Sequence, residues 1–371
     1  MLVDTEQLRK YRSPGRINLI GEHTDYNSGF VLPGAVDMHL IFEVRPSEDA
    51  LFHFHSKHFD EVDSCNQFGQ GFDKRWSIFF GQVIHLMHKK GHVLKPVYCS
   101  FEGTLPIGAG MSSSSALTCG LIYALNDHNS LGISTLDMMY LASEAERGSG
   151  LDGGKMDQYS ILFGEANAVL LLDCQSYTHR KIHVDLGEYT IVLFDTRVTH
   201  ELLDSGYNDR HADCKRGLKQ LKAKFPELNT VRDITIDQLQ AGDALLDPVS
   251  RERLNYVIEE NDRVQKVVRA LEDGKVHELG TLMYEGHEGL RRKYEVSCDE
   301  LDFIVDWTKD RSEVLGARMM GGGFGGCVIA IVKKDQLNSI FDAMNEEYQE
   351  RFTISAAMHK IKLSQGVERV L

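Results

Sequence analysis

The feature that most restricts the fold is a run of 24 residues without a charged side chain, Gly103–Asn126. The run is long enough to cross a bilayer as a helix. However, Pro106, the neighbouring glycines Gly108 and Gly110, and four consecutive serines would leave polar groups without partners in lipid. We therefore expect this run to lie inside a globular fold, as a loop between a strand and a helix.

Composition argues against two classes of partner. The 371 residues include 41 Lys and Arg against 55 Asp and Glu, a net charge of −14. Nucleic acids and the cytoplasmic membrane surface are anionic, so we expect neither to be a partner. The seven cysteines form no Cys-x-x-Cys pair, and the first residues contain no apolar stretch. Both observations indicate a reducing compartment, and we expect the protein to be cytoplasmic.

The order of strand and helix patterns predicts an α+β chain of two domains. An N-terminal domain of mixed sheet and helix is expected over residues 1–185, and a helix-rich C-terminal α+β domain over 186–360. The tail, about 360–371, is expected to return to the first domain. Charged amphipathic helices are predicted over 208–224 and 249–311, and the simplest interpretation of their charges is a solvated helix face.

Three segments carry candidate chemistry. In Ser13–Pro33, an apolar run is followed by polar side chains that suit a hydroxyl-rich ligand, although a capped turn explains them equally well. In Leu105–Leu117, glycines and serines before a helix suit a phosphate, although such a loop is more often a plain connection. It is not a Walker A loop, since the Gly-x4-Gly-Lys pattern is absent. In Arg318–Val332, five glycines indicate close backbone packing or a hinge.

A fourth segment, Gly153–Gly164, places Asp157 on a predicted short helix after two glycines. Alone, an Asp at this position is usually a helix cap. The three histidines His53, His55 and His58 lie on a strand and its exit without a matching carboxylate, so a metal site there is not expected.

Taken together, the segments resemble the galactokinase family. GRINLIGEHTDYNSG at residues 15–29 resembles its N-terminal signature, and GGKMDQYSILFG the segment with its catalytic Asp. LPIGAGMSSSSAL and GARMMGGGFGGCVIAIV resemble the phosphate loop and the third motif of the wider superfamily of galactokinase, homoserine kinase, mevalonate kinase and phosphomevalonate kinase. The matches run in the same order along nearly the whole chain.

The resemblance implies a two-domain sugar kinase whose active site lies in the cleft between the domains. The implied reaction transfers the γ-phosphate of ATP to the 1-hydroxyl of D-galactose. Asp157 and Arg16 would be catalytic, and Ser114 and Glu146 would bind Mg²⁺. The residues that would hold the sugar are Glu22, His23, Asp25, Gly154 and Tyr207. The residues that would hold ATP are Trp76, Gly108, Ala109, Gly110, Met111, Ser112, Ser113, Ser114 and Ser115.

Two alternatives stay open. The same chemistry on N-acetylgalactosamine, arabinose or galacturonate would use the same motifs. A non-catalytic sugar and ATP sensor would resemble known sensors that lack two residues after the serine run, whereas Ser112–Leu117 has the full length here. Lys155 stands where the family commonly has an apolar residue, and it could tune specificity. A monomer is expected.

Overall fold

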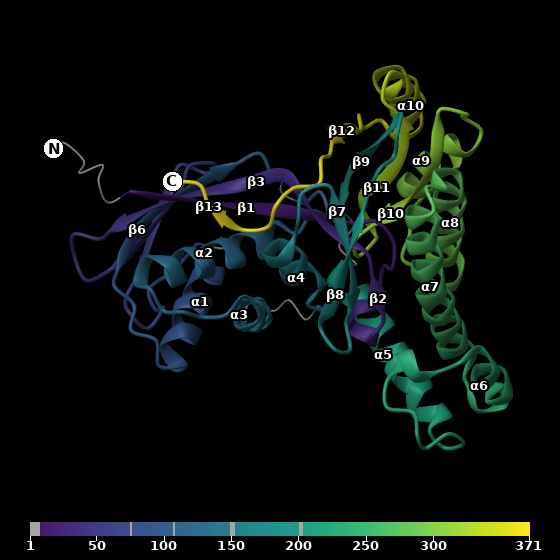
Figure 1. The fold of residues 1–371 in the computed structure, drawn as a ribbon, viewed down its shortest axis with the longest axis horizontal. Coiled ribbons are helices and arrows are strands. Elements are labelled where there is room, and N and C mark those ends of the chain that lie inside the picture. Colours follow the sequence, from purple (N-terminus) through teal and green to yellow (C-terminus); the bar gives the residue numbers. More distant parts are fainter. Residues whose placement is uncertain (1–7, 75, 107, 149–152, 200–202) are drawn as a thin grey trace.

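The computed structural model describes residues 8–74, 76–106, 108–148, 153–199 and 203–371. In Figure 1 the chain forms two halves. A strongly twisted sheet with helices on one side makes up the first half, and long helices packed beside a second sheet make up the other. The mixture of elements confirms the predicted α+β class.

The first sheet has the strand order β13-β1-β3-β6-β4-β5, and its neighbours are antiparallel except for the parallel pair β4 and β6. Its strands are β1 (Arg9–Asn18), β3 (Pro33–Pro46), β4 (Phe52–Ser56), β5 (Glu61–Cys65), β6 (Val97–Gly103) and β13 (Glu368–Arg369). The helices on one side of this sheet are α1 (Ile78–Lys89), α2 (Ser113–Asn129), α3 (Thr135–Gly148) and α4 (Met156–Phe163). Helices α2 and α4 pack directly on β1 and β3.

The second sheet has the order β10-β11-β9-β12, and a small third sheet has the order β2-β7-β8. Their strands are β9 (Tyr189–Thr199), β10 (Val314–Met320), β11 (Gly325–Lys333), β12 (Ala357–Lys360), β2 (Phe30–Val31), β7 (Ala168–Asp173) and β8 (Thr178–His183). The later helices are α5 (Leu203–Leu221), α6 (Ile236–Ala241), α7 (Pro248–Glu272), α8 (Val276–Gly289), α9 (Asp299–Lys309) and α10 (Leu337–Phe352). Short helical turns lie at Asp25–Asn27, Val231–Asp233, Asp243–Leu245 and Leu290–Tyr294.

The C-terminal tail crosses back to the first sheet, as Figure 1 shows in yellow. Strand β13 pairs antiparallel with β1, with Arg369 opposite Tyr11. An isolated bridge between Val36 and Leu363 attaches the tail to β3 on the way. The tail therefore adds a strand at the outer edge of the sheet that carries β1.

Two hydrophobic cores meet along β9. Leu193 belongs to the core of the first half, whereas its neighbours Val192 and Phe194 point into the second core. Helix α7 contributes to both, because Val264 packs in the first core and Leu254 in the second. The division of the chain at residue 185 stays a prediction. Within the described part of the chain, no helix has both the length and the apolar character required to span a bilayer.

Candidate active site

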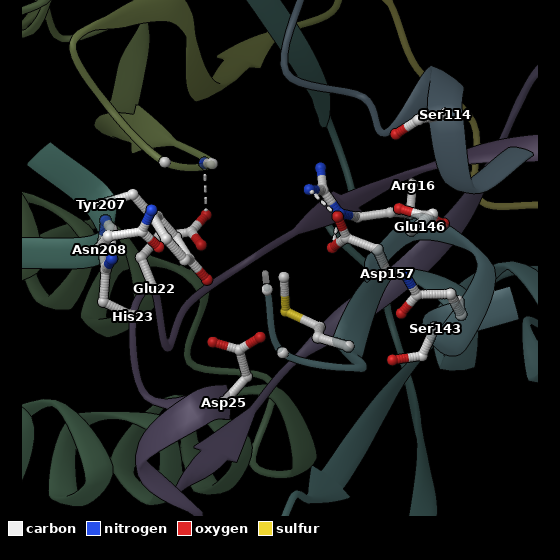
Figure 2. A pocket seen from close by; sticks show the side chains of 16 residues that line it. Arg16, Glu22, His23, Asp25, Ser114, Ser143, Glu146, Asp157, Tyr207 and Asn208 are labelled. Atoms are coloured by element: carbon white, nitrogen blue, oxygen red, sulfur yellow. Dashed lines mark hydrogen bonds and ion pairs between the residues drawn. The ribbon is translucent and has the colours of Figure 1, made fainter. Parts of the chain in front are cut away.

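A cavity of about 250 Å³ lies where the two halves meet (Figure 2). Six separate segments contribute to its wall: the end of β1 and the turn after it, the starts of α2 and α4, the C-terminal half of α3, the start of α5 and the glycine loop after β10. The predicted site residues that line it are Arg16, Glu22, His23, Asp25, Ser114, Glu146, Gly154, Asp157 and Tyr207. Residues far apart in the sequence are therefore brought to one space.

Arg16 and Asp157 form a two-pronged ion pair across the cavity wall. Arg16 Nε lies 2.6 Å from Asp157 Oδ1, and Nη2 lies 2.9 Å from Oδ2. Ser112 Oγ donates to the same Oδ2 at 2.6 Å. Only 7% of the Arg16 side chain is exposed, against 30% of Asp157, so the carboxylate is the member of the pair that faces the open space. Paired bonds of this kind fix the plane of a carboxylate.

Glu22 is held by a buried arginine that the sequence did not predict as part of the site. Arg318 Nη1 and Nη2 lie 3.3 and 3.4 Å from Glu22 Oε1, and the backbone N–H of Gly321 donates to the same oxygen at 2.8 Å. These three contacts all converge on Oε1. This arrangement leaves Oε2 as the oxygen able to accept from a ligand in the cavity.

Asp25 faces the backbone of Gly154 at very close range. A Cβ atom at position 154 would lie 1.7 Å from Asp25 Oδ2, so only glycine lets this carboxylate keep its place. Burial, and then the charge of Asp157, raise the pKa of Asp25 to about 7. The carboxyl is thus poised between its charged and neutral forms near physiological pH.

This shift predicts how stability depends on pH. A carboxyl whose pKa is raised by folding contributes stability below its unfolded pKa of 3.8, and that contribution is lost as pH rises through about 7. We expect the Tm of the unliganded protein to fall between pH 5 and 8. The variant Asp25→Asn should flatten this slope and exceed the wild type by at least about 2 °C at pH 8. Thermal unfolding followed by circular dichroism measures both curves, and parallel curves would contradict the prediction.

Helix α7 holds the turn after β1, the turn that carries Glu22, His23 and Asp25. Tyr256 Oη donates to the carbonyl of Glu22 at 2.9 Å, and Glu260 Oε1 accepts from the N–H of Gly21 at 2.9 Å. Asn261 Oδ1 accepts from the N–H of Phe30 at 2.8 Å. The interpretation of this helix as charged and solvated was therefore wrong for one face, where Glu260 is fully buried.

The serine-rich loop wraps around Arg16 before α2 begins. Gly108 and Gly110 have φ angles of 80° and 69°, which glycine adopts without strain. Arg16 donates to the carbonyl of Gly110, and Cys327 Sγ lies 3.0 Å from the carbonyl of Ala109. Among the predicted loop residues, the side chains of Ala109, Met111 and Ser115 are buried, whereas Ser113 and Ser114 line cavities.

Glu146 is buried under the start of α2. Its Oε2 accepts from Ser115 Oγ at 3.0 Å, and its Oε1 accepts from Thr118 Oγ1 at 2.9 Å. Burial raises the pKa of Glu146 to about 7, despite the hydrogen bonds that favour its charged form. A cation beside this carboxylate would restore its charge.

A second cavity of about 750 Å³ adjoins the first at Ser114, which lines both. Its wall is mainly apolar and includes Trp76, Phe79, Phe101 and Leu117. Trp76 Nε1 donates to Glu61 Oε2 at 2.9 Å, which fixes the edge of the indole. The first cavity, lined by charged and polar side chains, therefore meets the mainly apolar second cavity at the N-terminus of α2.

The glycine loop after β10 packs against other backbone at Gly323 but not along its whole length. A Cβ at Gly323 would lie 2.0 Å from the carbonyl of Val296. A Cβ at Gly321 would lie 3.7 Å from the carbonyl of Gly110 in the serine-rich loop. The close packing explains glycine at position 323, whereas a Cβ at Gly326 would meet nothing within 4 Å. Gly321 and Gly322 line the cavity.

Sequence reasoning missed other residues of the wall. Ser143 and Asn208 also line the cavity. Ser143 lies one turn before the predicted residue Glu146 on α3, and Asn208 directly follows the predicted residue Tyr207 on α5. Lys155 is absent from the lining among the described residues; its Nζ lies 3.0 Å from Tyr177 Oη instead. A direct contact of this lysine with a ligand in the cavity is thus not indicated.

Comparison with known proteins gives consistent results along the chain. Residues 4–46 match the family model "Galactokinase galactose-binding signature", 78–165 match "GHMP kinases N terminal domain", and 267–350 match "GHMP kinases C terminal". The galactokinase of Thermotoga maritima is 39% identical over 362 residues, which are 97% of this chain and 100% of the relative. The galactokinase of Enterococcus faecalis is 33% identical over 97% of this chain and 95% of its own length.

The solved structures agree. The galactokinase of Lactococcus lactis, crystallised with galactose, superposes with a TM-score of 0.93 at 30% identity, covering 99% of this chain and 96% of the other. A mevalonate kinase superposes with a TM-score of 0.67 at 16% identity, over 96% of this chain and 99% of the other, and so shares the fold.

Proposed function

This chain belongs to the galactokinase family of the GHMP kinases, and from that premise we propose the role of each part of the site. Its activity is the ATP-dependent phosphorylation of galactose. The sugar occupies the polar cavity, and the nucleotide extends from the N-terminus of α2 into the apolar cavity. The observation that carries this assignment is the position of the Arg16–Asp157 pair beside Ser114, the residue that lines both cavities.

Asp157 is the group that meets the reacting hydroxyl. When the 1-hydroxyl oxygen of galactose bonds to the γ-phosphorus, the bond from that phosphorus to the bridging oxygen breaks, ADP leaves and the hydroxyl loses its proton. Asp157 orients this hydroxyl and accepts its proton. Arg16 holds the carboxylate in plane and stabilises the charge on the transferred group. Glu22, His23, Asp25 and Tyr207 hold the other sugar hydroxyls.

The residues present suit Mg²⁺. Ser114 and Glu146 line the same cavity and would supply oxygen ligands to the ion. Burial raises the pKa of Glu146, and a nearby cation would favour its charged form. Mg²⁺ is commonly held by one or two protein oxygens together with substrate phosphates. When bound with ATP, it would neutralise phosphate charge. The described residues hold no group of three or more His, Cys, Asp or Glu side chains suited to a metal, which fits an ion that arrives with the nucleotide.

The phosphate site has little positive charge of its own. The run Gly103–Asn126 contains no Lys or Arg, so the N–H groups at the start of α2, with Arg16 and Mg²⁺, supply the local field. The net charge of −14 therefore does not oppose nucleotide binding at this place.

Trp76 forms part of the adenine site. We expect Trp76→Ala to raise the KM for ATP about tenfold and to change the KM for galactose less than twofold, because it removes an aromatic wall from the apolar cavity alone. The matched control is Trp307→Ala, on α9, where the indole Nε1 bonds to Glu347. Steady-state ADP release measures both constants. An unchanged KM for ATP in the Trp76 variant would contradict the placement.

The choice of sugar is tested by a panel. ADP release with Mg·ATP is measured for galactose, N-acetylgalactosamine, arabinose and galacturonate, and galactose is expected to give the highest kcat/KM. Preference for an amino or acidic sugar would favour the related sugar 1-kinases. Tight binding of sugar and ATP without turnover would favour a sensor. We also propose that a monomer is the active form, since one chain lines both cavities, and gel filtration tests this.

A further inference from the structure

The two ring nitrogens of His23 have very different surroundings. Nδ1 lies 2.7 Å from Tyr26 Oη. Nε2 is buried without a hydrogen-bond partner among the described residues, and His23 lines the cavity (Figure 2). What the imidazole can do for a sugar therefore depends on which of the two nitrogens carries the hydrogen.

Nδ1 is the end of a chain of polar groups that runs into the second core. Tyr26 Oη lies 2.9 Å from Tyr294 Oη, and Tyr294 Oη lies 3.4 Å from Cys214 Sγ. Asn27 Nδ2 donates to the carbonyl of His23 at 2.8 Å, which fixes the orientation of the amide, and it lies 3.5 Å from Tyr294 Oη. Tyr294 and Cys214 are fully buried, so water does not complete the chain.

Each group in the chain is neutral near pH 7. Burial lowers the pKa of His23 to about 3, against a hydrogen bond with the backbone of Gly322 that raises it, and the charges of Arg210 and Arg318 lower it further. Burial raises the pKa of Cys214 to about 11, and it raises the pKa of both tyrosines well above their usual value. A neutral imidazole has one N–H, and each hydroxyl and thiol has one hydrogen, so the whole chain must donate in one direction or in the other.

The acceptors at the two ends decide the direction. In one direction the last acceptor is the imidazole nitrogen Nδ1, and in the other it is the thiol sulfur, which is a weak acceptor. Asn27 Nδ2, 3.5 Å from Tyr294 Oη, can donate to that hydroxyl in either direction, so the choice rests on the two end acceptors. The cavity is also lined by the carboxylates of Glu22, Asp25 and Asp157, which favour an N–H rather than a lone pair at its wall.

We propose that Tyr26 and Tyr294 are positioning residues that hold His23 as the tautomer with hydrogen on Nε2. The imidazole then donates to a hydroxyl oxygen of the sugar, whereas the carboxylates accept from sugar hydroxyls. This proposal rests on galactose occupying the polar cavity, as set out above. It makes His23 selective for an oxygen that can accept a hydrogen bond.

The test measures the tautomer directly. In full-length protein labelled with ¹⁵N-histidine, two-bond ¹H–¹⁵N correlations are recorded, and His23 is assigned by the signal that disappears in His23→Gln. We expect an unprotonated Nδ1 and a protonated Nε2 in the wild type. In Tyr26→Phe, which loses the hydroxyl donor, we expect hydrogen to move at least partly to Nδ1. The KM for galactose should rise about tenfold, and kcat should change less than threefold.

The matched control is Tyr284→Phe, whose hydroxyl bonds to Thr308 away from the cavity and which should leave the His23 signal unchanged. A wild-type His23 with hydrogen on Nδ1, or an unchanged tautomer in Tyr26→Phe, would overturn the proposal. If Tyr26→Phe does not fold, Tyr294→Phe, one hydroxyl further along the chain, is scored by the same criteria. The spectra need no turnover, so their result is separate from the sugar panel that tests the activity.

Discussion

Replacing Asp157 by Asn is expected to lower kcat by about 10³-fold while changing the KM for galactose less than tenfold. Both carboxylate oxygens are in use, since Oδ1 accepts from Arg16 Nε and Oδ2 accepts from Arg16 Nη2 and Ser112 Oγ. An amide keeps the size of the group but presents an NH₂ to one of these donors. With the roles proposed above, the variant loses the proton acceptor and disturbs the arginine that would stabilise the transferred phosphoryl group.

The matched control for this variant is Ser112→Ala. It removes one hydrogen bond to Asp157 Oδ2 and leaves the charge and both Arg16 contacts in place. We expect its kcat to fall about tenfold or less, in line with the loss of one hydrogen bond to a charged group. Near-normal turnover by a correctly folded Asp157→Asn protein would remove Asp157 from the reaction.

A second acceptor sugar separates two roles of Asp157. In 2-deoxy-2-fluorogalactose the 1-hydroxyl is more acidic, so the reaction depends less on a base. If Asp157 acts mainly as a proton acceptor, the loss of kcat in Asp157→Asn should be smaller with this sugar than with galactose. An equal loss with both sugars would indicate that the carboxylate acts mainly by orienting the hydroxyl.

The sequence predicted residues that the structure brings to one cavity, because their pattern of residue type and spacing is local. Glu22, His23 and Asp25 stand within four residues of one another, and Gly154 and Asp157 flank the start of a helix. Such clusters of residue type and spacing can be read without a fold. The structure brings both clusters to the same cavity.

The sequence did not predict what holds these residues in place, because that information lies in contacts across long separations. Glu260 meets Gly21 across 239 positions, and Arg318 meets Glu22 across 296. A charged side chain on an amphipathic helix has the same local pattern whether it meets water or a buried N–H. Polar strands such as β8 give no local signal for a related reason, since sheet pairing rather than an apolar pattern defines them.

Removal of Arg318 is expected to have the largest effect on stability among the variants considered. The side chain is fully buried, and its donors reach the carbonyls of Leu19 and Met319 at 2.9 and 2.6 Å, the carbonyl of Asn18, and Glu22. Arg318→Met leaves a buried carboxylate and three carbonyl groups without these donors. Breaking a buried ion pair in this way costs about 3–5 kcal/mol, and we expect a loss of this size in urea unfolding.

A control variant and a double-mutant cycle identify the cause of that loss of stability. Arg292→Met removes an arginine that is 73% exposed and paired with Glu288 on the surface, and it should cost less than about 1 kcal/mol. The double variant Glu22→Gln, Arg318→Met should be more stable than Arg318→Met alone, because the neutral amide no longer leaves a buried charge uncompensated. If the double variant is as unstable as the sum of the single changes, the carboxylate is not what Arg318 stabilises, and its bonds to the backbone carbonyls account for the effect. Either result measures how strongly Arg318 of β10 fixes the turn after β1 that carries Glu22, and this is one of the contacts that join the two halves at the cavity.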